Sequence, residues 1–131
     1  MIYIFDTYAW IEYFLGSEKG KVVQSLLANT KNRIVTLECS IGELKTWSLK
    51  NKLDFTVYYR VVRADSWLMK LVLPDWIKAA EIRHEQRKYH KDFGMLDALL
   101  LVKQKELRAM VVSGDPHFAG LKEVLFLSSI G

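Results

Sequence analysis

The chain opens with Met1-Ile2-Tyr3-Ile4-Phe5-Asp6, five apolar residues that end at a carboxylate. Apolar, β-branched and aromatic residues in so short a run predict a strand that is buried on both faces. A second run of this kind, Ala109-Met110-Val111-Val112-Ser113, is followed two residues later by Asp115. Strands buried on both faces are typical of parallel sheets that helices cover. These two stretches therefore predict an α/β fold.

Helical periodicities fill the sequence between the expected strands. Apolar residues at the spacing 0, 3, 4, 7 from Phe55 onward predict one such helix. The pattern as a whole predicts a three-layer α/β/α architecture with a short central parallel sheet, in a single domain spanning residues 1–131. The expected strands cover residues 1–5, 33–36, 70–73, 109–113 and 124–127, and the expected helices cover 7–15, 18–28, 40–49, 54–69, 74–89 and 95–107, with a short turn or helix at 116–121.

Composition excludes several classes of protein. Half of the 131 residues are apolar, which is too many for a disordered chain. The longest apolar runs are about five residues, whereas a membrane-spanning helix needs roughly 20. Cys39 is the only cysteine, so no disulfide forms within the chain, and this favours a reducing compartment. Because the start carries no basic, extended apolar export signal, we expect a cytoplasmic protein.

Positive charge is concentrated in the middle of the chain. The net charge is +4, and residues 45–70 contain six basic and two acidic residues. Basic residues interleaved with aromatic ones suit a polyanion such as RNA. A solvated helix face above core aromatics produces the same pattern, and the sequence leaves both alternatives open. The aromatic residues of this segment are Trp47, Phe55, Tyr58, Tyr59 and Trp67.

Four acids are expected at one edge of the sheet. Asp6 and Asp115 follow strands that we expect to be parallel, and ligands of such sheets bind beyond the carboxyl ends of the strands. Glu43 is expected in the first turn of the helix that starts at this edge. Asp97 is expected in the first turn of a helix that is otherwise apolar, where an unpaired carboxylate is costly.

Each acid also has a simpler structural role. Asp6 or Asp115 would cap the helix or turn that follows it. Ser40 and Glu43 would form a capping box, and Asp97 would favour a helix start through the helix dipole. Four independent caps have no reason to converge on one edge, however, so the joint pattern favours a functional site.

Convergence of carboxylates has an electrostatic consequence. Two carboxylates about 4 Å apart repel each other by about 4 kcal/mol at an effective dielectric constant of 20. A divalent cation removes this repulsion, and sites built from carboxylate oxygens suit Mg²⁺ or Mn²⁺. Such ions assist phosphodiester cleavage. The four acids therefore predict a site for a divalent cation.

Each of the four acids lies in a short block of sequence. The blocks are Asp6-Thr7, Ile41-Gly42-Glu43-Leu44, Leu96-Asp97-Ala98-Leu99 and Ser113-Gly114-Asp115-Pro116-His117-Phe118. In their order and spacing along nearly the whole chain, they resemble the acidic blocks of PIN-domain ribonucleases. A chain of this length most resembles the VapC-type toxins of toxin–antitoxin pairs.

The resemblance implies an endoribonuclease that depends on Mg²⁺ or Mn²⁺, with RNA as substrate and an antitoxin protein as partner. It implies that Asp6 is the central metal ligand and that Glu43 and Asp97 complete that site. Asp115 would assist a second metal ion or orient the attacking water, and Ser113 would hydrogen-bond a metal-binding carboxylate or a phosphate. All four acids are thus candidate metal ligands, and Ser113 joins them as a candidate catalytic residue.

Several positions depart from the family pattern or compete with it. Tyr8 stands where the family often has a small polar residue, next to Thr7, whose hydroxyl or amide would contact the site. His117 stands where some members carry another acid. Glu38 is a rival for the role of Glu43, although we expect it to precede the helix. His84 and His90 are expected at the solvated surface, and Cys39 is expected to be a small apolar residue.

Two other functions remain open. One is a PIN-type nuclease of RNA maturation that has no antitoxin, and the other is an RNA-binding module that has lost catalysis. The aromatic stretch from Phe55 to Trp67 exceeds the needs of a small core. We therefore expect a homodimer and an exposed apolar groove for a partner helix.

Overall fold

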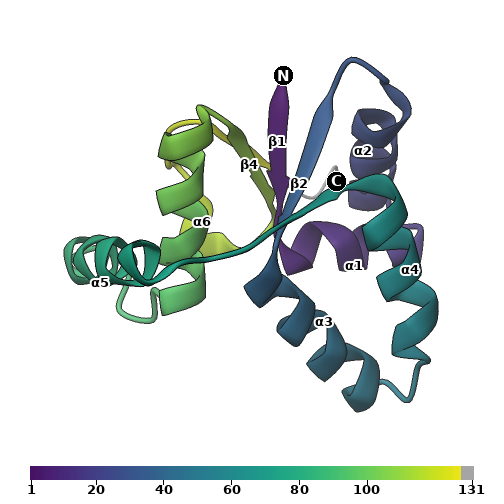
Figure 1. Ribbon diagram of the computed structural model, residues 1–131, viewed down its shortest axis with the longest axis horizontal. Coiled ribbons are helices and arrows are strands. Elements are labelled where there is room, and N and C mark those ends of the chain that lie inside the picture. The colour runs from purple at the N-terminus through teal and green to yellow at the C-terminus, as the bar shows by residue number, and fades with distance from the viewer. Residues whose placement is uncertain (128–131) are drawn as a thin grey trace.

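The computed structural model describes residues 1–127 and contains a five-stranded parallel sheet with the order β3-β2-β1-β4-β5 (Figure 1). Each strand pairs in parallel with its neighbour, which confirms the predicted fold class. The strands are β1 (Ile2–Phe5), β2 (Arg33–Leu37), β3 (Trp67–Met69), β4 (Met110–Ser113) and β5 (Val124–Phe126). The helices are α1 (Thr7–Leu15), α2 (Glu18–Ala28), α3 (Glu38–Lys50), α4 (Phe55–Asp65), α5 (Leu73–Gln86) and α6 (Met95–Leu107), with a 3-10 turn, η1, at Pro116–Phe118.

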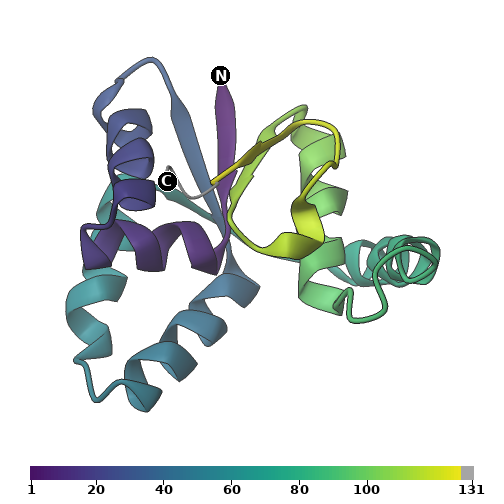
Figure 2. The ribbon, with the colours of Figure 1, turned by 180° about the vertical axis from the view of Figure 1, so that it is seen from behind.

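Helices cover both faces of the sheet. Helices α1 to α4 lie on one side, and α5 and α6 lie on the other, as Figures 1 and 2 show from opposite directions. This is the three-layer α/β/α arrangement expected from the sequence. None of the helices in residues 1–127 is both long enough and apolar enough to cross a membrane.

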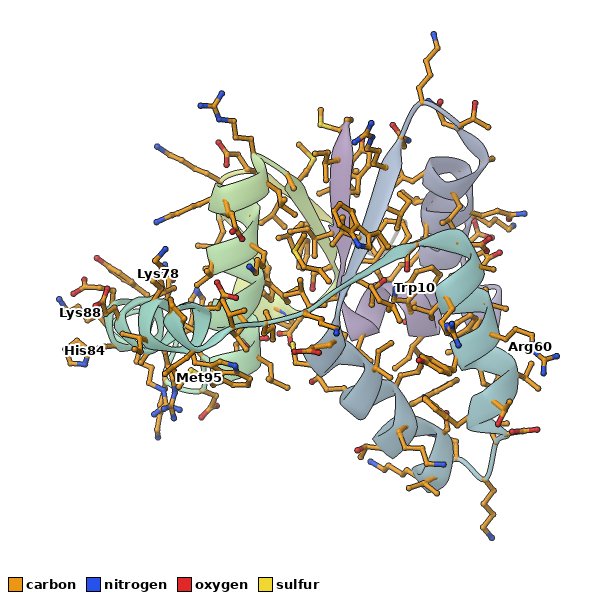
Figure 3. The ribbon with its side chains drawn as sticks, in the orientation of Figure 1. Trp10, Arg60, Lys78, His84, Lys88 and Met95 are labelled. Carbon is orange, nitrogen blue, oxygen red and sulfur yellow. The ribbon has the colours of Figure 1, made fainter. Side chains whose placement is uncertain are left out.

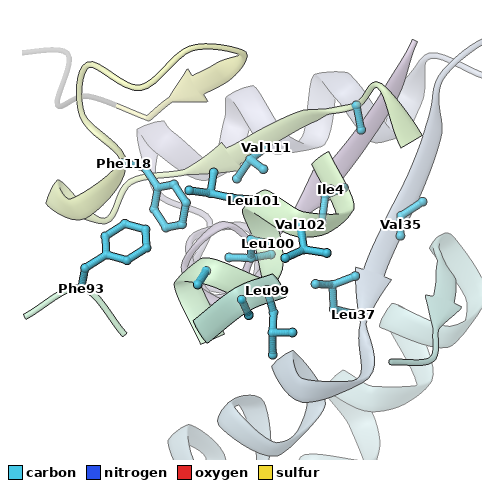
Figure 4. Close-up of a cluster of buried hydrophobic side chains, with 13 residues drawn as sticks. Ile4, Val35, Leu37, Phe93, Leu99, Leu100, Leu101, Val102, Val111 and Phe118 are labelled. Atoms are coloured by element: carbon cyan, nitrogen blue, oxygen red, sulfur yellow. The ribbon is translucent and has the colours of Figure 1, made fainter. Parts of the chain in front are cut away.

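Successive residues along a strand are buried alternately on the two faces of the sheet. Ile4 and Val111 are fully buried in the cluster beneath α6, which Figure 4 shows in close-up. Their neighbours Phe5 and Val112 are fully buried on the opposite face, in the cluster that contains Trp10 of α1. Because both faces of the sheet are buried, the strand sequences are continuous apolar runs and do not alternate between apolar and polar residues.

Strand β1 is the point at which the strand order changes direction. From β1 the chain passes through α1 and α2 to β2 and β3, and α5 and α6 then carry it to β4 on the other side of β1. Open parallel sheets bind ligands beyond the carboxyl ends of their strands at such a point. Asp6 follows β1 directly and therefore occupies this position.

The segment between α4 and α5 differs from the prediction. Helix α4 ends at Asp65, and β3 covers residues 67–69 and not 70–73. The helix ends at Ser66, where the backbone turns extended (φ −144°, ψ 163°). The backbone N–H of Ser66 completes the last helical hydrogen bond to the carbonyl of Val62 at 3.0 Å, and its hydroxyl donates to the same carbonyl at 2.7 Å. Apolar residues continue on both sides of this stop, so the helical spacing gave no sign of it.

Helix α3 also begins earlier than predicted. Strand β2 extends to Leu37, and the helix starts at Glu38 without a side-chain cap. The expected capping box is therefore wrong: Ser40 is buried in the first turn, and Glu43 lies in the second turn. The other element boundaries agree with the prediction to within three residues.

Gly20 lies where α2 packs most closely on α1. A Cβ atom at this position would lie 2.1 Å from the carbonyl oxygen of Glu12, which cannot move without disturbing its helix. Thermal denaturation of the Gly20→Ala variant is therefore expected to show a loss of about 1–3 kcal/mol in the free energy of unfolding. Gly42 in α3 has open space around it, so Gly42→Ala is expected to gain about 0.5–1 kcal/mol. Equal effects of the two changes would contradict this packing.

Candidate functional site

Asp6 begins the candidate site at the carboxyl end of β1. Its backbone N–H extends the ladder by donating to the carbonyl of Val112, at 3.3 Å. Its side-chain Oδ1 accepts from the backbone N–H of Ala9 at 2.8 Å and so caps α1. The capping role is therefore real, but it engages only one carboxylate oxygen.

The carboxyl group of Asp6 is buried, with 6% of the residue exposed. Its pKa is raised from the ordinary 3.8 to about 7, chiefly by burial and also by the charges of Asp115 and Glu43, against the lowering effect of hydrogen bonds from Ser113 and Ala9. A carboxylate that is this hard to ionise is a strong candidate for cation binding or proton exchange.

Glu43 projects from the second turn of α3 toward the same edge. The hydroxyl of Thr7 donates to its Oε1 at 2.8 Å and holds it beside the residue that follows Asp6. Burial raises the pKa of Glu43, and the charges of Asp97 and Asp115 raise it further. The four expected acids, from four separate segments, are therefore close enough to influence one another electrostatically.

Asp97 and Asp115 both lie beside His117, whose place next to Asp115 was visible in the sequence but whose contact with Asp97 was not predicted. His117 Nδ1 lies 3.1 Å from Oδ2 of Asp97 and 3.4 Å from Oδ1 of Asp115. One possible ligand atom from each of these three residues lies within 4.8 Å of the others. Asp97 also accepts from the N–H of Gly94 at 3.1 Å, and Asp115 from the N–H of His117 at 2.9 Å. Both acids therefore cap a helix or turn, and each has a second oxygen that this cap leaves unused.

Ser113, the last residue of β4, is fully buried and forms hydrogen bonds with residues of the candidate site. Its Oγ accepts from the backbone N–H of Asp115 at 3.0 Å, and its hydroxyl also lowers the pKa of Asp6. Between them, Gly114 has no room for a side chain, because a Cβ atom would lie 2.2 Å from the ring of Tyr8. The Tyr8 ring thus packs on the loop that carries Asp115, and its hydroxyl accepts from Lys19 Nζ at 2.7 Å.

The competing residues have other roles. Glu38 lies inside α3, not before it as expected, and its Oε1 accepts from the backbone N–H of Leu71 at 2.8 Å. Cys39 is half-buried against the core, and burial raises the pKa of its thiol to about 11, which disfavours a nucleophile. His84 is exposed as expected (Figure 3). His90, in contrast, is half-buried, with its ring centre 6.2 Å from that of His117.

The aromatic residues of the basic segment are divided between core and surface. Tyr58 packs against Phe14 and Trp47, with ring centres 4.7 and 5.4 Å apart. Lys45 Nζ lies 5.0 Å from the ring centre of Phe55, while Arg60 projects from the surface of α4 (Figure 3). Core aromatics beneath a charged face thus account for part of the segment.

The donor chemistry of the edge fits a divalent cation. Asp6, Glu43, Asp97 and Asp115 offer carboxylate oxygens, which are the ligands that Mg²⁺ and Mn²⁺ prefer. Within residues 1–127, no lysine or arginine forms an ion pair with any of the four. The remaining group of possible positive charge beside them in this part of the chain is His117, which is charged only if protonated, so a divalent cation would relieve their mutual repulsion.

No protein-family model matches the sequence, and no curated protein is detectably similar to it in sequence. Solved structures, in contrast, match almost the entire chain. A chain of the VapBC2 complex from Rickettsia felis, bound to a fragment of promoter DNA, aligns with a TM-score of 0.73 and 17% identity, over 96% of this chain and 97% of that one. The chain has a VapC-type, PIN-like fold.

Two further structures share this VapC-type fold. A toxin–antitoxin complex from Klebsiella pneumoniae matches with a TM-score of 0.72 and 20% identity, over 97% of this chain and 98% of that one. VapC20 of Mycobacterium tuberculosis, a toxin that cleaves the sarcin–ricin loop, matches with a TM-score of 0.71 and 18% identity, over 95% and 97%. At these identities the similarity establishes the fold, and it confirms at that level the resemblance found in the sequence.

Proposed function

We propose that the chain is a metal-dependent endoribonuclease and the toxin of a toxin–antitoxin pair. The observation that carries the proposal is the convergence of four carboxylates on the carboxyl edge of the sheet, two of them with raised pKa values. The VapC-type fold supports the choice of RNA as substrate, because a neighbour of similar fold cleaves an RNA loop.

In this proposal the four acids have different roles in binding metal ions and orienting water. Asp6, Glu43 and Asp97 hold one divalent cation, either Mg²⁺ or Mn²⁺, and Asp115 assists a second ion or orients the attacking water. When bound, such a cation polarises the scissile phosphate and lowers the pKa of a water molecule. The remaining contacts orient these ligands: Thr7 hydrogen-bonds Glu43, and Ser113 holds the backbone of Asp115.

We propose two protein partners, an antitoxin and a second copy of the chain. Four of the matching structures are toxin–antitoxin complexes, which supports an antitoxin partner. The cytoplasm, expected from the sequence, remains our proposal for where the pair acts. For the homodimer, the structure offers a surface other than the aromatic stretch expected from the sequence: an exposed apolar face at the start of α5. A monomer mass by light scattering at micromolar concentration would contradict dimerisation through this face. The apolar face at the start of α5 consists of Val72, Leu73, Trp76 and Ile77, which are 57, 72, 40 and 57% exposed.

Experiments can distinguish the two alternative functions from this proposal. A maturation nuclease would cleave RNA without arresting growth and without an antitoxin. A non-catalytic RNA-binding module gains nothing from four clustered carboxylates, because they repel phosphates unless a cation intervenes. RNA binding that is unchanged by EDTA, with no cleavage in Mn²⁺ or Mg²⁺, would favour that module. We expect cleavage of tRNA, rRNA or mRNA in Mn²⁺ or Mg²⁺ and none in EDTA.

A matched pair of substitutions on α3 tests the assignment of Glu43. The Glu43→Gln variant is expected to lose RNA cleavage on the order of a hundred-fold, because an amide neither neutralises a cation nor replaces a charged ligand. The control is Glu38→Gln, which keeps an oxygen for the N–H of Leu71 and is expected to cleave at the wild-type rate. Initial rates in saturating Mn²⁺ measure both. The reverse result would transfer the ligand role to Glu38.

A further inference from the structure

We propose that Nδ1 of His117 is a metal ligand, which with Asp97 and Asp115 forms a mixed nitrogen and oxygen site that selects Mn²⁺ over Mg²⁺. The inference rests on the proposed function, since it concerns the same edge of the sheet. It goes beyond that function by naming a ligand that is not an acid and by predicting which ion the site prefers.

The spacing of the three side chains suits a metal ion. Two ligands in adjacent positions around an octahedral ion, each about 2.1 Å from it, lie about 3.0 Å apart. His117 Nδ1 is 3.1 Å from Asp97 and 3.4 Å from Asp115, so both separations are close to that value. The three side chains are 28, 20 and 36% exposed, which leaves the group open to an ion from solution.

The imidazole is held in this position by its surroundings. His117 lies in η1 directly after Pro116, and its backbone N–H donates to Asp115 at 2.9 Å. Its ring centre lies 5.9 Å from that of buried Phe93 and 6.2 Å from that of His90. The ring therefore has aromatic neighbours on its protein side while Nδ1 faces the two acids.

Nitrogen as a donor changes the choice of ion. Mg²⁺ prefers oxygen ligands almost exclusively. Imidazole is a ligand of first-row transition ions, and of the two ions considered only Mn²⁺ belongs to that row, with carboxylate oxygens among its usual ligands. A site with one imidazole and two carboxylates therefore favours Mn²⁺ over Mg²⁺, whereas four carboxylates alone would discriminate little.

The same distances also suit a histidine that donates a hydrogen bond to the acids and occupies the place of a cation. The two roles predict opposite effects of removing the ring. A ligand contributes affinity for Mn²⁺, so its loss weakens binding. A competing donor occupies the site, so its loss strengthens binding.

Electron paramagnetic resonance of the full chain with Mn²⁺ alone distinguishes these roles. Wild-type protein is expected to show electron spin-echo modulation from a directly bound ¹⁴N, which changes when histidine is labelled with ¹⁵N. In His117→Ala this nitrogen signal is expected to disappear, and Mn²⁺ affinity is expected to fall about 10- to 100-fold. Affinity for Mg²⁺, measured by competition, should change far less. His117→Asp should restore binding and lower the preference for Mn²⁺, and His84→Ala, at an exposed position, should change nothing.

A wild-type Mn²⁺ complex without the nitrogen signal would overturn the inference, as would a signal that persists in His117→Ala. Unchanged or tighter Mn²⁺ binding by that variant would overturn it as well. These results separate from failure of the proposed function. Metal-dependent cleavage without the nitrogen signal removes only the inference, and the nitrogen signal without cleavage removes only the endoribonuclease.

Discussion

RNA cleavage is expected to fall on the order of 100- to 1,000-fold when Asp6 or Asp97 is replaced by asparagine. Asparagine keeps the shape of the side chain and an oxygen for the capping N–H of Ala9 or Gly94, so the helix starts survive. What it removes is the negative charge that a divalent cation requires. The loss is expected in the rate at saturating metal, measured as initial rates with the same RNA and Mn²⁺.

The control for this loss is Asp92→Asn, which removes an exposed carboxylate five residues before Asp97. It is expected to cleave at the wild-type rate, because it leaves the cluster intact. Wild-type rates in both Asp6→Asn and Asp97→Asn would show that the site has been assigned to the wrong residues.

The metal-free Asp6→Asn variant is expected to be more stable than the wild type at pH 8, by about 2–4 kcal/mol. The cause is the raised pKa of buried Asp6 in the folded chain. At about 1.4 kcal/mol per pKa unit, the rise from 3.8 to about 7 sets an upper limit near 4 kcal/mol. Asparagine carries no charge to bury and keeps the cap on α1.

The pH dependence follows from the direction of this change. Below about pH 4, Asp6 is protonated in both states and costs nothing. Between pH 4 and 7 the folded state holds a proton that the unfolded state has released, so stability falls as the pH rises. Above pH 7 the full cost is present. In Asp6→Asn this part of the slope disappears, while the part that belongs to the raised pKa of Glu43 remains.

Thermal denaturation in EDTA between pH 4 and 8, with and without added Mn²⁺, measures both effects. Wild-type protein is expected to gain stability from Mn²⁺ at pH 8, because the ion binds only the folded state. The variant is expected to gain little. Equal melting temperatures of the two proteins in EDTA at every pH would contradict an unfavourable buried charge at Asp6.

The sequence was sufficient to predict the layers and the edge of the sheet at which the acids lie; there Asp97 and Asp115 offer ligand atoms within 4.8 Å of each other, while Asp6 and Glu43 are linked to the group through their charges. Apolar runs such as those that end at Phe5 and Ser113 require a sheet covered on both faces, and parallel strands bring Asp6 and Asp115 to one edge. The direction of a helix that leaves this edge then carried Glu43 there, even though the helix starts at Glu38 and not at Ser40. The order and direction of the strands and helices determined where the acids lie, and the exact residues at which these elements begin and end mattered less.

Local boundaries and surface roles were harder to predict because they depend on contacts across the fold. The end of α4 depends on hydrogen bonds of Ser66, one of them with Thr36 on β2 at 2.8 Å. The place of His117 depends on the path of η1 relative to α6. Its spacing from Asp115 in the sequence was visible, but nothing in a single sequence shows that its ring turns toward Asp97. The apolar face of α5 was likewise hidden, because Leu73 and Trp76 resemble core residues.

Anomalous diffraction from crystals grown with Mn²⁺ tests the central claim most directly. We expect a manganese peak within bonding distance of oxygens from Asp6, Glu43 and Asp97, at the carboxyl end of β1. A map at millimolar Mn²⁺ with no peak at this edge, or with manganese only at acids elsewhere on the surface, would contradict a metal centre at the point where the four acids meet.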